Sequence, residues 1–208
     1  IRFGTDGWRE RIGEGFTMDK VRRVATGIAR HLAHIRGQTG GTVVVGYDGR
    51  FLSAEAADEV SRTLAACGLR VCLGRAMMPT PQVSFAVRHL GADLGVMVTA
   101  SHNPPVWNGI KVKSARGASI DPATAAAIEA IANGLDAGDV PSAAQRKAAR
   151  VEVFDPFDAY RAHVATRIDL AAIARWGGTV VVDAMYGSAQ GLLPRLLAPV
   201  GVAVHEIR

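Results

Sequence analysis

The sequence is poor in cysteine, lysine and aromatic residues, and it has no long apolar run. Its 208 residues include two cysteines, Cys67 and Cys72, and 6% are aromatic. Two thiols provide neither a zinc ligand set nor a disulfide framework, so we expect both to be buried as small apolar side chains. No stretch is long enough to span a bilayer, and the N-terminus lacks the charged-then-apolar pattern of a secretory signal. We therefore expect no membrane partner and a cytoplasmic location.

The charge balance is basic, with 24 lysines and arginines against 19 acidic residues, a net charge of +5 and a pI near 9.7. This balance raises a nucleic-acid-binding module as an alternative function. The cationic residues, however, are spread along the chain without aromatic interleaving, and no nucleic-acid motif occurs, so we expect no nucleic-acid partner. Lysine is the rarer cation, since only four of the 24 are lysines, and a lysine at position 111 is therefore not the default choice.

Apolar periodicity predicts alternating helices and strands in the first two thirds of the chain. The composition, 49% hydrophobic and 21% charged, is that of a globular protein with one domain and part of another. The expected elements are a helix at 18–35, a strand at 42–47, a helix at 53–67, a strand at 69–73, a helix at 80–90, strands at 93–98 and 110–114, and a helix at 121–133. Ser53 is expected to cap its helix, and Gly68 to follow its end. This order predicts an α/β sandwich, in which ligands bind at strand ends.

A polar, alanine-rich stretch from 136 to 150 is expected to connect to a second unit. The predicted domains are 1–148 and 149–208. Beyond the connection we expect helices at 156–166 and 170–175, a strand at 179–183, a helix at 188–197 and a strand at 202–205. Two parallel strands cannot bury both faces or satisfy their outer edges, so the second unit is expected to be incomplete. The oligomeric state is not readable from these patterns.

The segment TASHNPP, Thr99–Pro105, carries the main chemical signal. Ser101 follows a buried strand, and two prolines then force the backbone out of regular structure. A rigid loop at a strand end is a common place for reactive groups, although a loop serine is more often a local cap. His102 invites a serine-hydrolase interpretation, but there is no GxSxG elbow and no evident third member, so we do not expect a catalytic triad.

Four segments in this order resemble the α-D-phosphohexomutase family of phosphoglucomutase, phosphomannomutase and phosphoglucosamine mutase. They are FGTDGWR at 3–9, VVGYDGRFLS at 44–53, PTP at 79–81 and TASHNPP at 99–105, which NGIK at 108–111 continues. Any one alone would be a weak signal, and together they are a strong one. Within the first segment, Gly4, Asp6 and Gly7 predict a tight turn, and the resemblance implies that this turn presents Arg9 to the cleft. We interpret Asp48 and Arg50 in the second as mainly structural.

The resemblance implies a three-layer α/β/α sandwich with a mixed sheet, followed by an incomplete second α/β domain. It also implies that Ser101 carries a phosphoryl group, which is passed to a phosphosugar substrate through a hexose 1,6-bisphosphate intermediate. Mg²⁺ would be bound through the phosphate on Ser101, with its remaining ligands later in the second domain. Sugar and phosphate recognition would lie in further domains, so we expect the 208-residue chain alone to be inactive.

The residue types suit phosphoryl transfer, which needs a nucleophile, cations for the oxygens and a proton shuttle. Arg9 has a planar fork that suits phosphate oxygens, and Lys111 is the better proton carrier because arginine does not deprotonate. His102 and Asn103 are secondary members of the loop. The alternatives are that Arg9 is a solvated surface cation and that Lys111, alternating with apolar neighbours, lies on the outward face of a strand with Lys113.

The substrate prediction depends on small differences from the family forms. FGTDGWRE departs from the FGTDGIRG form typical of phosphoglucosamine mutases at Trp8 and Glu10, and NPPVWNGIKVK resembles the hexose branch. Both differences favour glucose or mannose phosphates as substrates, without a choice between these two sugars. A phosphoglucosamine mutase and a non-catalytic phosphosugar-binding module on the same fold remain as alternatives.

Overall fold

The computed structural model describes residues 1–4 and 7–208, so Thr5 and Asp6, with the tight turn expected there, lie outside the described residues. The chain divides into two compact units, Ile1–Phe154 and Asp155–Arg208.

A mixed sheet forms the centre of the first unit, and the described residues contribute seven strands to it. In spatial order these are β1 (Phe3–Gly4), β2 (Gly7–Arg11), β6 (Trp107–Ser114), β5 (Leu94–Val98), β3 (Thr42–Tyr47), β4 (Arg70–Gly74) and β7 (Glu152–Phe154). The four strands from β5 to β7 are parallel, whereas β1, β2, β6 and β5 pair antiparallel in that order. The carboxyl ends of β3 and β5 therefore lie at the same edge of the sheet as the start of β6.

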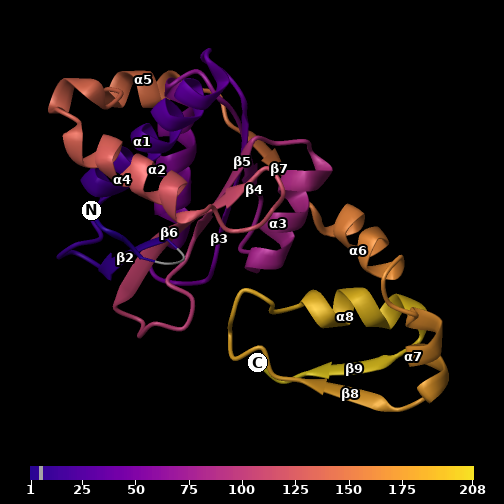
Figure 1. Ribbon diagram of the computed structural model, residues 1–208. Helices are drawn as coiled ribbons and strands as arrows, with labels where there is room; N and C mark the ends of the chain where they lie inside the picture. The colour runs from indigo at the N-terminus through magenta and orange to yellow at the C-terminus, as the bar shows by residue number, and fades with distance from the viewer. Residues whose placement is uncertain (5–6) are drawn as a thin grey trace. The chain divides into compact units, whose positions relative to one another are not determined.

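Helices cover both faces of this sheet. Helices α1 (Met18–Arg36), α2 (Ser53–Ala66) and α4 (Pro122–Gly134) lie together on one face, and α3 (Thr80–His89) lies on the other (Figure 1). Strand β3 shows the alternation, because Val43 and Val45 contribute to the core under α1 and α2 while Val44 packs with residues of α3. The predicted three-layer α/β/α sandwich with a mixed sheet is confirmed.

Small residues in the sheet allow α3 to pack closely. A Cβ added at Gly95 in β5 would lie 2.5 Å from Val87 Cγ2, and one at Gly46 in β3 would clash with Val83. These glycines sit where the two apolar side chains of α3 meet the sheet, so the close approach of the helix requires a residue without a side chain.

The boundaries of β3, β5 and the first helices agree closely with the sequence prediction, and several other elements differ. Strands β1, β2 and β7 and helix α5 (Ala143–Ala148) were not predicted, because elements of two to six residues carry little periodicity. Helix α5 docks on α2 through an ion pair of 2.7 Å between Arg146 Nε and Glu59 Oε1. Strand β6 begins at Trp107 rather than 110.

The predicted cap of α2 is wrong. The N-cap residue is Leu52, in the left-handed region at φ 63°, and Ser53 is the first helical residue. Its hydroxyl donates instead to Asp48 Oδ1 at 2.7 Å. Ser53 therefore ties the helix to the turn after β3 and does not cap the helix. The glycine predicted beyond the helix end, Gly68, does adopt a left-handed conformation, at φ 88°.

The second unit contains a parallel pair of strands, with a helix between them in the chain. Its elements are α6 (Phe157–Ala165), α7 (Leu170–Trp176), β8 (Thr179–Val182), α8 (Leu192–Leu197) and β9 (Ala203–Glu206). The Arg195 guanidinium lies 3.4 Å from the centroid of the Phe157 ring, a cation–π contact that fixes α8 to the start of α6. Helix α8 begins later than predicted, at 192 rather than 188.

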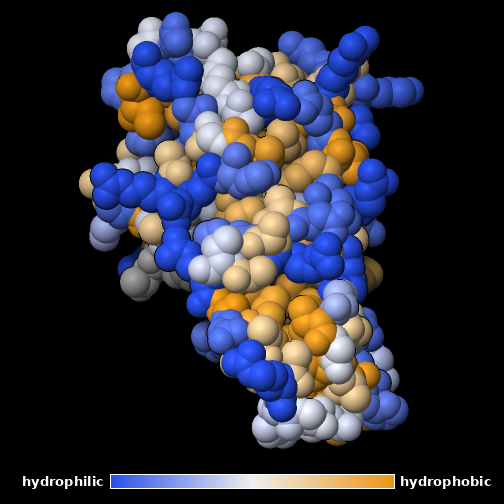
Figure 2. All heavy atoms as spheres, turned by 90° about the vertical axis from the view of Figure 1, so that its right-hand side faces the viewer, coloured by the Kyte–Doolittle hydropathy of each residue, from blue (hydrophilic) through white to orange (hydrophobic). Residues whose placement is uncertain are grey.

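Hydrophobic and hydrophilic residues are mixed on the face shown in Figure 2. Among the described residues, none of the helices combines the length and the apolarity needed to cross a bilayer.

Both cysteines are free thiols. Cys72 is buried in β4, as predicted, and Cys67 at the end of α2 is only half-buried.

Candidate functional site

Three polar segments meet at the carboxyl edge of the parallel strands. The turn Asp48–Arg50 follows β3, the serine loop 99–106 follows β5, and β6 starts where that loop ends. The Asp48 amide donates to the Val98 carbonyl oxygen at 3.1 Å, and the Thr99 amide donates to that of Gly109 at 2.9 Å. The sheet thus brings together residues that are far apart in the sequence.

Ser101 is exposed, and its backbone is in the left-handed region at φ 58°. A non-glycine residue is rarely found there, and such strain persists only where surrounding contacts hold it. One of these contacts is local, because the Ser101 amide donates to Thr99 Oγ1 at 2.8 Å. Since the strained bend lies at the surface, the Ser101 hydroxyl is accessible to a ligand.

Arg50 holds the serine loop through four main-chain carbonyl oxygens. Its Nη2 donates to Ser101 O and Asn103 O, each at 2.7 Å. Its Nη1 donates to Pro104 O at 3.0 Å and Trp107 O at 3.1 Å. A planar guanidinium presents several donors in one plane, which lets a single side chain satisfy several carbonyl groups.

Asp48 links Arg50 to Thr99, which lies two residues before Ser101. Its Oδ2 accepts a hydrogen bond of 2.6 Å from Thr99 Oγ1 and lies 3.4 Å from Arg50 Nε. The Arg50 and Asp48 side chains are 15% and 13% exposed. Because Thr99 Oγ1 also accepts from the Ser101 amide, a chain of polar contacts runs from Arg50 through Asp48 and Thr99 to Ser101.

Arg9 contacts the same loop from β2. It lies opposite Gly109 of β6, and its Nη1 donates to Asn103 Oδ1 at 3.0 Å. The structure therefore brings two of the predicted site residues, Arg9 and Asn103, into direct contact. The alternative that Arg9 is merely a solvated surface cation does not agree with this position.

Lys111 lies on β6 and is 7% exposed. Directly opposed residues in a sheet share a face, so the pairings of Arg9 with Gly109 and of Lys111 with Met97 place both cations on the α3 side. Lys113 is on the same face and is equally buried, with its Nζ donating to Ser119 Oγ at 3.0 Å. The alternative of an outward, solvated strand face is therefore wrong for both lysines.

His102 is exposed, and its Nδ1 lies 3.4 Å from Ser101 Oγ. That separation is long for a hydrogen bond between a nucleophile and its base. The geometry thus favours the view that His102 belongs to the loop without being part of a triad. Within residues 1–4 and 7–208, no group of three or more His, Cys, Asp or Glu side chains is placed to hold a metal ion.

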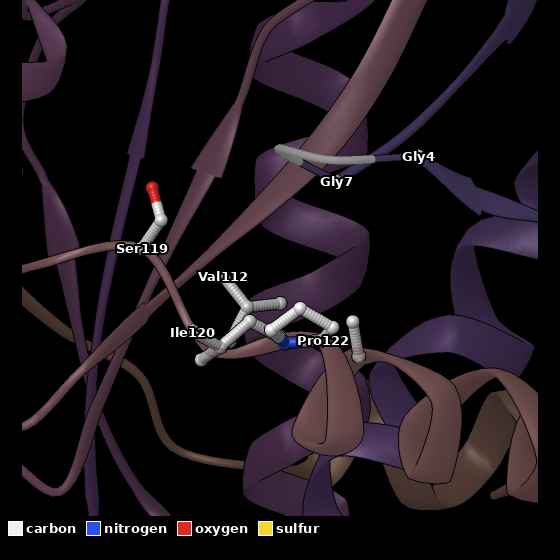
Figure 3. Close-up of a pocket in the computed structure, with 7 residues that line it drawn as sticks. Gly4, Gly7, Val112, Ser119, Ile120 and Pro122 are labelled. Carbon is white, nitrogen blue, oxygen red and sulfur yellow. The ribbon is translucent and has the colours of Figure 1, made fainter.

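Two hollows lie near the β1–β2 hairpin. The larger, about 410 Å³, is open and is lined by Arg2, Phe3, Gly4, Gly7, Arg9, Glu10 and Trp107. The smaller, about 40 Å³, is lined mainly by apolar groups, and Figure 3 shows Val112, Ile120 and Pro122 gathered around it. A sugar-sized ligand needs several hundred Å³, so of these two only the hollow beside Arg9 has a suitable size.

Asp48 and Arg50 were interpreted as mainly structural, and their contacts, which are all with protein groups, agree with that interpretation. The link from Asp48 through Thr99 to the serine was not predicted, although all three residues lie within the matching segments. Asn108, which is fully buried, donates to Phe51 O at 3.0 Å and to Ser53 Oγ at 2.9 Å. The signal in the sequence was a charged Asp-Gly-Arg turn directly after a buried strand, where solvated polar residues would also occur.

Known proteins are similar to this chain in sequence and in fold. The domain profile described as "Phosphoglucomutase/phosphomannomutase, alpha/beta/alpha domain I" matches residues 1–139. A phosphoglucosamine mutase from Synechococcus elongatus is 37% identical over 210 residues, which are 99% of this chain and 43% of that protein. A phosphoglucomutase from Staphylococcus haemolyticus is 39% identical over 138 residues, 65% of this chain and 25% of its own length.

Among solved structures, a protein from Thermus thermophilus that is provisionally named a phosphomannomutase matches with a TM-score of 0.90 and 39% identity. The match covers 100% of this chain and 45% of that one. The chain thus spans less than half the length of the Synechococcus and Thermus relatives.

Proposed function

The chain belongs to the α-D-phosphohexomutase family, and from this premise we propose that it forms the phosphoserine-bearing part of an enzyme that interconverts hexose 1-phosphate and hexose 6-phosphate. The observation that carries the proposal is an exposed Ser101, held at a strained bend, with Arg9 in contact with the same loop. A nucleophile fixed beside a cation is the arrangement that phosphoryl transfer requires.

In the proposed cycle, Ser101 Oγ starts as a phosphate ester. A sugar hydroxyl oxygen attacks the phosphorus atom, and a new P–O bond forms as the bond to Ser101 Oγ breaks. The proton that the sugar hydroxyl loses passes by way of Lys111 to the departing Ser101 oxygen, so the transfer gains and loses no net proton. The resulting hexose 1,6-bisphosphate turns around and returns its other phosphate to Ser101 by the reverse of these bond changes.

Arg9 supplies the cationic partner for the transferred phosphate. The guanidinium keeps its charge throughout the cycle, so it can stabilise the oxygens before and after transfer. The open hollow of about 410 Å³ beside Arg9 offers space for the sugar. In this proposal the first unit, Ile1–Phe154, is phosphohexomutase domain I, and Asp155–Arg208 begins domain II. The predicted boundary, with domains 1–148 and 149–208, would separate β7 from the sheet in which it pairs with β4.

The described residues do not by themselves fit a magnesium site, which needs about six oxygen ligands in octahedral geometry. No suitable cluster of carboxylates occurs among them, and a phosphorylated Ser101 would supply a ligand only through its phosphate. The proposed bond changes therefore involve Ser101, Lys111 and Arg9 and do not depend on a metal ion held by the described residues.

The substrate is proposed to be glucose or mannose phosphate, on the basis of Trp8 and Glu10 in the first motif. The names of the relatives include phosphoglucosamine mutase, phosphoglucomutase and phosphomannomutase, so assays must include all three sugars. Turnover is expected from the full-length protein that carries this chain. We expect none from residues 1–208 alone, because they span less than half the length of the enzymes they resemble.

The test is to replace Ser101 with alanine in the full-length protein and to assay turnover with labelled hexose 1,6-bisphosphate. We expect turnover to be abolished and no label to reach the serine loop. Ser114→Ala is a matched control, because the Ser114 hydroxyl bonds locally to the Ala118 carbonyl oxygen at the far end of β6. Near-normal turnover in Ser101→Ala, or label deposited elsewhere in the wild type, would remove Ser101 from its proposed role.

A further inference from the structure

The Arg50 side chain has used all of its hydrogen-bonding capacity within the protein. A guanidinium carries five N–H groups, two on each Nη and one on Nε. The Nη atoms make two hydrogen bonds each, all to carbonyl oxygens of residues 101–107, and Nε faces Asp48 Oδ2 at 3.4 Å. These contacts leave no N–H group for a phosphate oxygen, although Arg50 lies within the loop cluster where a phosphate would bind.

We propose that Arg50 is a positioning residue for phosphoryl transfer, which fixes the Ser101 bend through the loop carbonyls and does not contact the substrate. The inference rests on the proposed function of Ser101. It assigns different tasks to two arginines of one site, since Arg9 reaches the loop through the Asn103 side chain and Arg50 reaches it through the main chain.

The loop needs such a clamp because its own main-chain bonds are few. Pro104 and Pro105 have no N–H group, so neither can donate to a neighbouring strand. Within the loop, the Asn103 amide donates to Ala100 O at 3.1 Å and the Trp107 amide donates to Pro104 O at 3.0 Å. Two bonds of this kind do not hold a non-glycine residue in the left-handed region, so the contacts with Arg50 and Thr99 contribute the remaining restraint.

The negative charge of Asp48 explains how Arg50 can hold the serine loop without attracting the substrate phosphate to itself. Asp48 lies beside the guanidinium, and both side chains are largely shielded from solvent. A shielded pair presents little net charge to a ligand at the loop surface. Arg9, in contrast, borders the open hollow, where an anionic substrate would approach.

The test is Arg50→Lys in the full-length protein, because lysine keeps the charge but has three donors on one atom and cannot reach four carbonyls. We expect kcat to fall by roughly 100-fold, since a misplacement of about 1 Å can cost that much. The KM for hexose phosphate is expected to change less than about 3-fold, because no substrate contact is lost. Arg62→Lys, at an exposed helical ion pair with Asp58, is the matched control.

A physical measurement on the 208-residue chain accompanies the kinetics. In Arg50→Lys we expect hydrogen exchange at the Asn103 and Trp107 amides to accelerate by about 10-fold or more, while the amides of β3 and β5 keep their wild-type rates. Unchanged exchange together with an unchanged kcat would overturn the proposal. A raised KM at unchanged kcat would also overturn it, because this result would make Arg50 a substrate ligand.

Comparing Ser101→Ala with Arg50→Lys distinguishes failure of the Arg50 proposal from failure of the proposed function. If Ser101→Ala is inactive while Arg50→Lys has wild-type kcat, the clamp is refuted and the function stands; if Ser101→Ala is active, the function itself fails. Should Arg50→Lys not fold, Asp48→Asn tests the same chain of contacts, because an amide has one acceptor oxygen where Asp48 uses two. Oδ2 accepts from Thr99 and faces Arg50 Nε, and Oδ1 accepts from Ser53 Oγ and the Arg50 amide. We expect a reduced kcat at near-constant KM, and wild-type kinetics with wild-type exchange would refute the clamp.

Discussion

Replacing Thr99 with valine isolates the hydrogen bonds that hold the serine bend, because valine has nearly the same shape and lacks the hydroxyl group. Thr99 is buried, and its Oγ1 donates to Asp48 Oδ2 at 2.6 Å and accepts from the Ser101 amide at 2.8 Å. The substitution leaves a shielded carboxylate without its shortest donor and an amide without its acceptor.

The expected loss can be estimated bond by bond. A hydrogen bond to a charged group contributes about 1.5–3 kcal/mol, and a neutral one contributes about 0.5–1.5 kcal/mol. Water can replace the acceptor of the exposed Ser101, so we expect a net loss of about 2–3 kcal/mol. For a unit of this size, such a loss lowers the melting temperature by about 5–10 °C. Thr99→Ser keeps the hydroxyl and loses one methyl group, which costs about 1 kcal/mol.

The assay is equilibrium unfolding in urea, followed by tryptophan fluorescence. Because the chain has two units, the signal must come from the first unit alone. Trp176 is exposed in the second unit, so a Trp176→Phe background leaves Trp8 and Trp107 as reporters of the first unit. Equal midpoints for wild type and Thr99→Val would refute the estimate. A loss in Thr99→Ser as large as that in Thr99→Val would also contradict the estimate, because the serine variant keeps the hydroxyl group and loses only a methyl group.

Two further predictions concern β6 and α1. A Cβ at Gly109 would clash with the Trp8 carbonyl oxygen and lie 2.9 Å from Arg9 Cγ. Gly109→Ala should therefore destabilise the first unit by about 1–3 kcal/mol in urea unfolding, whereas Gly134→Ala, with open space around it, should not. Burial, and then the charge of His34, lower the pKa of His31. The unfolded chain then binds more protons, so stability should fall below about pH 6.5, and His31→Gln should flatten this dependence in urea titrations.

Several helices and strands could be predicted from the sequence, because the apolar pattern that indicates each one lies within its own residues. The strand Thr42–Tyr47 and the helix starting at Met18 have the expected bounds to within a residue, since continuous apolar runs and a helical stripe each indicate one structure. The short strands β1 and β7 could not be predicted in this way. Three residues such as Glu152–Phe154 become a strand only because the edge of β4 accepts them.

The sequence motifs named residues of the candidate site, but they did not predict the hydrogen bonds between these residues. Ser101, Arg9 and Asn103 could be named from the motifs, whereas the contact between Arg9 and Asn103 depends on the pairing of β6 with β2, a strand that the sequence analysis missed. The capping role expected of Ser53 was wrong for a related reason. A serine before a helix caps it by accepting from a backbone amide, but Ser53 is already the first helical residue. Its hydroxyl donates to Asp48 Oδ1 and accepts from Asn108 Nδ2.

The burial of Lys111 could not be predicted from the sequence alone. The alternation in β6 correctly indicates that Lys111 and Lys113 share a face, because side chains of a strand alternate. Whether that face meets solvent depends on α3, which packs on β3 and β5 through Gly46 and Gly95. A polar strand face is ordinarily exposed, so only the three-dimensional placement of α3 distinguishes a solvated lysine from one held beside the loop edge. The proton-carrying role proposed for Lys111 therefore depends on helix packing as much as on the motif that names it.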